Sequence, residues 1–93
     1  MFGDRLKLLR TSYNLSQVHL AEKLKVSKQA VSNWENNNIL PSVEMLVKIA
    51  SFFSVTTDYL LELDERNYLE ISGLSHEQLT HIQQIINDIL QNK

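Results

Sequence analysis

Glycine and proline are almost absent from this chain, and their scarcity constrains its fold more than any other feature. The sequence holds two glycines and one proline among 93 residues. Tight hairpins need glycine where φ is positive, and glycine-rich phosphate loops need it where backbone approaches a ligand. A chain with so few of these residues is typical of helices joined by short turns. The sequence therefore predicts an all-α fold.

Composition excludes several classes of protein. The chain is 43% hydrophobic and 22% charged, which is typical of a globular domain rather than a disordered segment. It contains no cysteine, so it forms neither disulfides nor cysteine zinc sites, and this fits a cytoplasmic protein. It has no apolar run of about 18 residues to span a membrane and no signal-peptide pattern at its start.

Hydrophobic spacing predicts five helices within residues 1–63, which we interpret as one globular domain. In the last of these helices, Tyr59, Leu60 and Leu63 are expected to face inward. From residue 64 to 74 the pattern weakens, and Tyr68, Leu69 and Ile71 interrupt polar residues, which indicates a linker with room for a short extended piece. The residues expected to cap the second to fifth helices are Ser16, Ser27, Ser42 and Thr56.

A further helix is predicted at the C-terminal end, over residues 75–93. Ser75 and Gln78 form a capping box, and Leu74 with Leu79 forms a hydrophobic staple, so this helix can stand alone. Its apolar stripe has coiled-coil spacing over about two heptads. The stripe either packs on the fifth helix of the same chain or joins two chains, and we favour the homodimer. The stripe consists of Leu79, Ile82, Ile86 and Ile89.

Residues 17–36 contain two short helices separated by a very short break. Ala21 is small enough to let two helix backbones cross closely, and Val26 fills the inside of the turn. Val31 and Trp34 then dock the second helix on the core, which predicts a helix-turn-helix. Its outer face is rich in amides and carries no acid, and amide and lysine side chains are those that read base edges. The residues of this face are Lys28, Gln29, Ser32, Asn33 and Asn36.

The stretches LKLLR, LSQVHLAEKLKVSKQAVSNWENN and PSVEMLVKIASFFSVTTDYLL resemble the phage repressor/Cro type of helix-turn-helix domain over Leu6 to Leu61. The resemblance implies the five-helix lambda-repressor-like fold, to which this chain adds a C-terminal helix. It also implies sequence-specific binding of double-stranded DNA, with the third helix in the major groove, and often a dimer. The base-reading positions of the family fall on Ser27, Lys28, Gln29, Ser32 and Asn33.

The resemblance assigns phosphate contacts to Ser16 and Gln17, at the start of the second helix. We expect Asn36, Asn38 and Ser42, together with backbone N–H groups, to complete this phosphate clamp and to fix the register on DNA.

Two other features of the family have counterparts in this chain. An arginine of the first helix and a glutamate at the end of the third fall on Arg10 and Glu35, which we interpret as a structural ion pair. Three positions that are usually glycine hold Lys25, Asn37 and Ser54. If these residues adopt positive φ, each costs roughly 1 kcal/mol.

Charge is divided unevenly along the chain. Residues 1–61 carry seven basic and five acidic side chains, whereas residues 62–93 carry two basic and six acidic ones. The net charge of −2 therefore does not argue against DNA binding, because the acidic excess lies in the C-terminal part.

We predict a sequence-specific DNA-binding transcriptional regulator that binds a dyad operator as a homodimer. The alternative is an antitoxin-type DNA-binding protein whose acidic C-terminal region masks a protein partner. A structural protein that does not bind DNA is a further alternative.

The sequence predicts no enzyme. We identify no catalytic residues, because the carboxylates are scattered and no serine, histidine and aspartate form a constellation. His19, His76 and His81 do not have the spacing of metal ligands. No metal, cofactor, membrane or small-molecule ligand is therefore expected.

Overall fold

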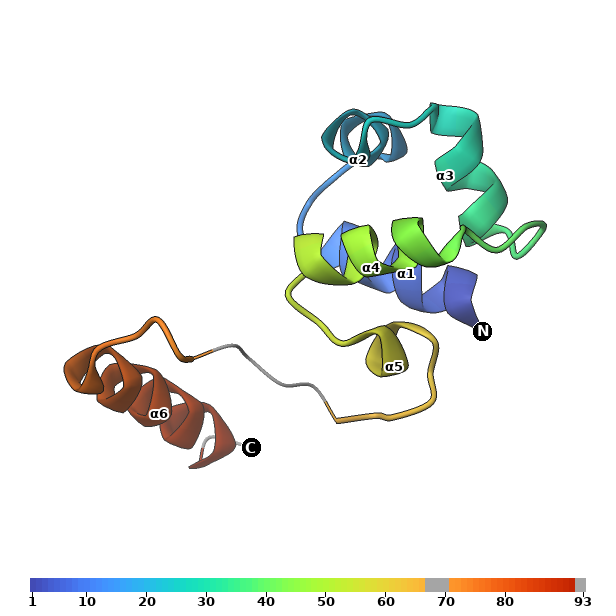
Figure 1. Cartoon of the computed structure of the whole chain (residues 1–93). Helices are drawn as coiled ribbons and strands as arrows, with labels where there is room; N and C mark the ends of the chain where they lie inside the picture. The colour runs from blue at the N-terminus through green and yellow to red at the C-terminus, as the bar shows by residue number, and fades with distance from the viewer. Residues whose placement is uncertain (67–70, 92–93) are drawn as a thin grey trace.

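The computed structural model describes residues 1–66 and 71–91, and within these ranges every regular element is a helix (Figure 1). The all-α prediction is thus confirmed. Part of the predicted linker, with Tyr68 and Leu69, lies outside the described residues, as do the last two residues of the predicted C-terminal helix. The helices are α1 (Phe2–Ser12), α2 (Gln17–Leu24), α3 (Lys28–Glu35), α4 (Val43–Phe52), α5 (Thr57–Leu60) and α6 (His76–Gln91).

Helices α2 to α5 each begin where a hydroxyl side chain caps the first turn. In each case the side-chain oxygen accepts a hydrogen bond from the backbone N–H three residues later, at 3.0–3.2 Å. This bond satisfies an N–H group that would otherwise lack a partner in the helix. The capping residues are those predicted, Ser16, Ser27, Ser42 and Thr56.

Helices α1 to α5 enclose one hydrophobic core. Helix α3 packs against α1 and α2, and α5 packs against α1 and α4. The expectation that Leu63 faces inward is wrong, since this side chain is 74% exposed. Helix α5 ends at Leu60, and Glu62 turns the chain with a φ of 62°, so Leu63 points away from the core. The core residues are Phe2, Leu6, Leu20, Ala21, Leu24, Val31, Trp34, Ile49, Ala50, Phe53 and Leu60.

Several turns contain residues with positive φ, and among the described residues none of these is glycine. Lys25 and Asn37 have a φ of 59° and Ser54 has a φ of 55°, at the three positions where the resemblance leads us to expect glycine. Lys25 ends α2, and the N–H of the next residue, Val26, bonds to the carbonyl of Ala21 at 2.9 Å. A left-handed residue thus lets the chain leave α2 and start α3 within a very short turn.

Arg5 fixes the chain as it leaves the five-helix body. Its side chain is buried, lies over the ring of Tyr59 at 4.1 Å and bonds to both carboxylate oxygens of Glu65 at 3.0 and 3.2 Å. Glu62 lies 3.8 Å from the same guanidinium. A hydrogen bond from the Met1 amino group and the charge of Arg5 lower the pKa of Glu62. Contacts with the body therefore continue past residue 63, into the predicted linker.

Helix α6 is set apart from the five-helix body (Figure 1). Ser75 and Gln78 form the predicted capping box, with reciprocal bonds of 3.0 and 3.1 Å. No described residue of α6 is buried, and Ile86 and Ile89 are 45% and 60% exposed. Packing on the fifth helix was one of the two interpretations of the stripe. The structure does not show it, because α5 does not cover the stripe. None of the described helices has the length and hydropathy needed to cross a bilayer.

Gly3 lies where the first turn of α1 meets the end of α3. Its N–H donates to Asn37 Oδ1 at 2.8 Å. A Cβ atom at this position would lie 2.5 Å from the carbonyl oxygens of Trp34 and Glu35. Both of these atoms belong to the backbone and cannot move without displacing the helix. Glycine is therefore required for α1 to close the end of α3.

We predict that Gly3→Ala destabilises the fold by about 1–3 kcal/mol, because the added methyl group forces α1 and α3 apart. Urea denaturation measures the loss. Gly73→Ala is the matched control, because a Cβ at Gly73 would meet no atom within 4 Å. Equal midpoints for the two variants would contradict the close contact of α1 with α3.

Candidate nucleic-acid interface

The turn between α2 and α3 leaves one face of α3 free. Val31 and Trp34 are buried on its inner face, and Val26 in the turn packs against the same core. On the α2 side the small Ala21 is 3% exposed. This packing holds α3 by its apolar side, so its polar side faces outward.

The predicted base-reading residues lie together on this outer face. Two hydrogen bonds run along it, from Gln29 Nε2 to Asn33 Oδ1 at 3.1 Å and from Asn36 Nδ2 to Ser32 Oγ at 3.4 Å. Ser27 precedes the helix as its exposed cap. Its oxygen accepts from the N–H of Ala30, which leaves its hydroxyl hydrogen for another partner. In this face Lys28, Gln29 and Asn36 are exposed, whereas Ser32 and Asn33 are half-buried.

The predicted phosphate contacts lie at helix ends. Ser16 and Ser42 are exposed caps of α2 and α4, where backbone N–H groups and the helix dipole favour an anion. Asn36 and Asn38 are exposed just after α3, and the N–H of Asn38 bonds to a carbonyl of α3 at 2.9 Å. Gln17 differs from the other four, because it is half-buried and its Nε2 donates to Glu35 Oε1 at 3.1 Å.

Arg10 and Glu35 form an ion pair between α1 and α3. Arg10 Nε and Nη2 donate to the two carboxylate oxygens at 2.6 and 3.1 Å. The Arg10 side chain is 11% exposed and that of Glu35 is 2% exposed. Arg10 Nη1 also donates to the Leu15 carbonyl at 2.7 Å, and Gln17 donates to Glu35. One charged network thus holds α1, the start of α2 and the end of α3 together.

His19 makes a polar contact with Ser16 that the sequence does not predict, because an exposed histidine by itself indicates no role. Its Nδ1 lies 2.9 Å from Ser16 Oγ, and its backbone N–H bonds to the same oxygen. The ring therefore lies beside one of the predicted phosphate contacts, Ser16. The signal available in the sequence is that His19 lies three residues after the cap, the position from which Glu or Gln reaches back in a capping box.

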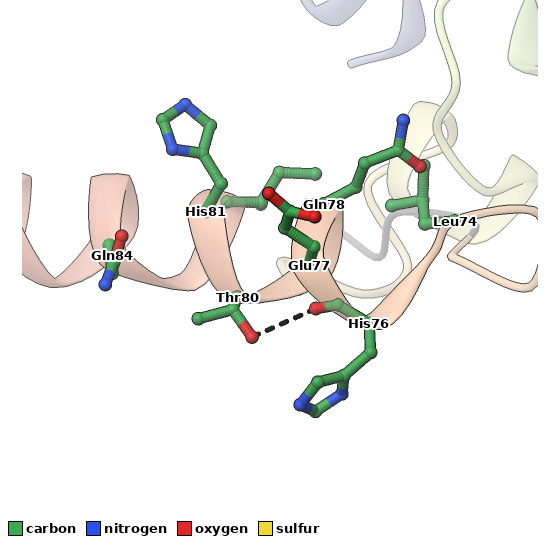
Figure 2. A pocket seen from close by; sticks show the side chains of 8 residues that line it. Leu74, His76, Glu77, Gln78, Thr80, His81 and Gln84 are labelled. Carbon is green, nitrogen blue, oxygen red and sulfur yellow. Dashed lines mark hydrogen bonds between the residues drawn. The ribbon is translucent and has the colours of Figure 1, made fainter.

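The other two histidines lie on α6, outside the face of α3. Figure 2 shows His76 and His81 on opposite sides of the α6 ribbon. Among the described residues, Leu74 and side chains of α6 line the shallow hollow at this helix. The dashed line in this view is the bond from Thr80 Oγ1 to the His76 carbonyl, 2.9 Å long. No group of three potential metal ligands occurs within residues 1–66 and 71–91.

We predict that Arg10→Met destabilises the protein by about 3–5 kcal/mol, because it leaves the carboxylate of Glu35 buried without its charge partner. Thermal unfolding measures the effect. Adding Glu35→Leu should recover much of the loss, since the second change removes the orphaned charge. Lys7→Met removes an exposed charge from the same helix and serves as the control. If Arg10→Met melts like this control, the ion pair does not stabilise the fold.

Sequence comparison connects this geometry with known proteins. The helix-turn-helix family model matches residues 6–60. The HTH-type transcriptional activator BcrR of Enterococcus faecalis is 48% identical over 64 residues, which cover 69% of this chain and 31% of BcrR. ImmR, an HTH-type transcriptional regulator of Bacillus subtilis (strain 168), is 31% identical over 86 residues, covering 92% of this chain and 68% of ImmR. The chain thus spans about a third of the length of BcrR.

The fold of this chain also resembles solved structures. The P22 c2 repressor in complex with the synthetic operator 9T has a TM-score of 0.65 and 30% identity, covering 69% of this chain and 97% of the repressor chain. A chain of the SinR–SinI complex matches with a TM-score of 0.63 and 26% identity, covering 100% of this chain and 100% of that chain. This chain therefore belongs to the helix-turn-helix family, together with phage repressors and HTH-type transcriptional regulators.

Proposed function

We propose that this protein is a sequence-specific DNA-binding transcriptional regulator that places α3 in the major groove. The observation that carries the proposal is the outer face of α3, where Lys28 and Gln29 are exposed and Asn33 is half-buried and bonded to Gln29. Glu35 is the single acidic residue of this helix, and it is buried in the pair with Arg10. Amide and lysine groups therefore face the DNA without a carboxylate to repel its phosphates.

The ends of α2 and α4 support the same orientation. Ser16 and Ser42 cap helices whose N-terminal N–H groups attract phosphate oxygens. Asn36 and Asn38 add amide donors to this phosphate clamp. Gln17 adds the second N–H of its amide, since the first donates to Glu35. Contacts of this kind fix the position of the protein on DNA, while the base contacts of α3 select the sequence. The P22 c2 repressor, a structural relative, has been solved in complex with a synthetic operator, which supports DNA as the ligand.

The test is selection of bound sites from a random pool of DNA duplexes, followed by affinity measurements on the selected site. We predict that Lys28→Ala and Gln29→Ala each weaken specific binding by about 1–3 kcal/mol, because each removes a base contact. Binding to unrelated DNA should change little for Gln29→Ala.

Lys23→Ala is the matched control for Lys28→Ala. It removes the same charge from an exposed position of α2, so any effect should be equal for all sequences. Wild-type affinity of both α3 variants for the selected site would show that other residues read the bases. A pool that yields no preferred sequence would contradict the proposed function itself.

We further propose that α6 joins two chains. A regular helix of 16 residues with no buried residue in its apolar stripe supports this proposal, because an isolated apolar stripe is stabilised by a partner. Two joined heads would double the contacts with DNA. Recognition helices about 34 Å apart would place the two half-site centres about 10 base pairs apart, on a dyad operator. The proposed interface consists of Leu79, Ile82, Ile86 and Ile89.

The double variant Ile82→Asp/Ile86→Asp should be a monomer, because it places charge in the middle of the apolar stripe. Sedimentation equilibrium at tens of micromolar measures the mass. Gln84→Asp/Asn87→Asp is the matched control, since it adds the same charge to exposed polar positions of α6. A dimer mass in the Ile82/Ile86 variant would place the interface elsewhere, and a monomeric wild type would remove the dimer proposal.

A second candidate function is that of an antitoxin-type protein that binds DNA with α3 and a protein partner with its C-terminal region. The exposed stripe of α6 and the six acidic side chains of residues 62–93 favour it. The SinR relative has been solved in complex with another protein, SinI. A basic protein that copurifies with the chain in equal amounts, and is lost in Ile82→Asp/Ile86→Asp, would distinguish this candidate from the homodimer.

A further inference from the structure

We propose that Asn33 is a positioning residue that orients Gln29, so that Gln29 reads an adenine in the major groove. This inference rests on the proposed function and adds a substrate preference to it. The residues lie one turn apart on the outer face of α3, a spacing at which helix side chains can contact each other. Gln29 Nε2 donates to Asn33 Oδ1 at 3.1 Å.

The two side chains differ in exposure, which assigns them different roles. Gln29 lies in the first turn of α3 and is exposed, whereas Asn33 is half-buried. The exposed residue has the longer side chain, so Gln29 reaches farther toward the groove than Asn33 does. We therefore assign the base contact to Gln29 and the supporting role to Asn33, which is the less exposed partner of the bond.

The helix that carries Asn33 is held firmly at its end. The backbone carbonyl of Asn33 accepts a hydrogen bond from the N–H of Asn38 at 2.9 Å. The next turn is closed by the bond from the Gly3 N–H to Asn37 Oδ1 at 2.8 Å. The backbone that carries the Asn33 side chain is thus fixed by hydrogen bonds.

The bond decides which groups of Gln29 remain for DNA. A primary amide has two N–H donors and one carbonyl acceptor. One donor is engaged by Asn33, so one donor and the acceptor Oε1 remain. The major-groove edge of adenine presents an acceptor at N7 and a donor at N6, which match this pair of groups. Guanine presents two acceptors, N7 and O6, so Oε1 of Gln29 would face an acceptor there without a hydrogen atom between them.

The bond also restricts Gln29 before DNA arrives. A glutamine side chain has several rotatable bonds, and fixing them on binding costs conformational entropy. With Asn33 in place, part of this cost has already been incurred in the free protein. Loss of Asn33 should therefore weaken the same base contact that loss of Gln29 removes.

The experiment starts from the site that the wild-type protein selects. Each base pair of one half-site is changed in turn, and affinity is measured by fluorescence anisotropy for wild type, Gln29→Ala, Asn33→Ala and Asn33→Asp. Gln29→Ala should lose a discrimination of about 5- to 150-fold at one A·T pair. Asn33→Ala should lose most of the wild-type preference for A·T at the same base pair. Melting curves verify that all variants are folded.

Asn33→Asp separates positioning from direct contact. Aspartate keeps an oxygen that accepts from Gln29 Nε2 but has no N–H with which to contact a base. Its charge should weaken binding to all sequences, while the preference for adenine at the Gln29 position remains. Equal losses of discrimination in Asn33→Asp and Asn33→Ala would overturn the positioning role, because they would show that the Asn33 amide donor is what matters.

A double-variant cycle completes the test. Gln29→Ala/Asn33→Ala should discriminate at this pair as poorly as Gln29→Ala and no worse, whereas Lys28→Ala and Asn33→Ala should have additive effects. The inference is overturned if Asn33→Ala keeps the adenine preference, if it alters a different base pair, or if Gln29 reads a base other than adenine. A wild-type protein with no sequence preference would instead refute the proposed function.

Discussion

The buried pair of Arg10 and Glu35 is the interaction on which the placement of α3 depends. Removing two charges from water is costly, and their attraction compensates only when the geometry is good and the remaining polar atoms are bonded. Both conditions hold here, because Arg10 also bonds to Leu15 and Glu35 also accepts from Gln17. Among the described residues, no buried side-chain nitrogen or oxygen lacks a hydrogen-bond partner. The network therefore specifies how α1, α2 and α3 are arranged, in addition to any stability that it contributes.

Gly3 extends the same constraint to the other end of α1. The charged network fixes α1 near its C-terminal end, and the contact of Gly3 with Asn37 fixes its first turn. Two parts of α1 thus hold the C-terminal end of α3 and the turn that follows it. This matters for DNA recognition, because small errors in the position of a helix change which base edges its side chains reach.

Local features of the fold could be predicted from sequence because they follow local rules. The caps at Ser16, Ser27, Ser42 and Thr56 need only a hydroxyl residue before an apolar helical pattern. Contacts between distant residues are different. Nothing in the spacing of the chain indicates that Arg5 will stack on Tyr59 and bond to Glu65, or that Gly3 will touch the end of α3. The prediction that Leu63 faces inward is wrong for a related reason. The outward position of Leu63 depends on a positive φ at Glu62, and glutamate rarely adopts positive φ.

The candidate site shows the same division. Helical spacing alone places Gln29 and Asn33 on one face, and residue type suggests base contacts. The hydrogen bond between them depends on side-chain conformation, which spacing does not determine. Likewise, the sequence shows Gln17 at a helix start, but only the structure shows that one of its donors is engaged by Glu35.

Basic side chains are scarce among the proposed DNA contacts, and this limits how much electrostatic attraction can contribute to binding. Lys28 is the only cation among the proposed base and phosphate contacts, and the other nine residues of that set are uncharged. Electrostatic attraction supplies most of the affinity of a protein for unrelated DNA, so a surface with few cations binds such DNA weakly. Hydrogen bonds to base edges must then provide a larger share of the specific binding energy. Because uncharged contacts contribute only when their geometry is good, fixing α3 and its amides in advance and pairing two heads through α6 would serve the same end: weak individual contacts are made to act together.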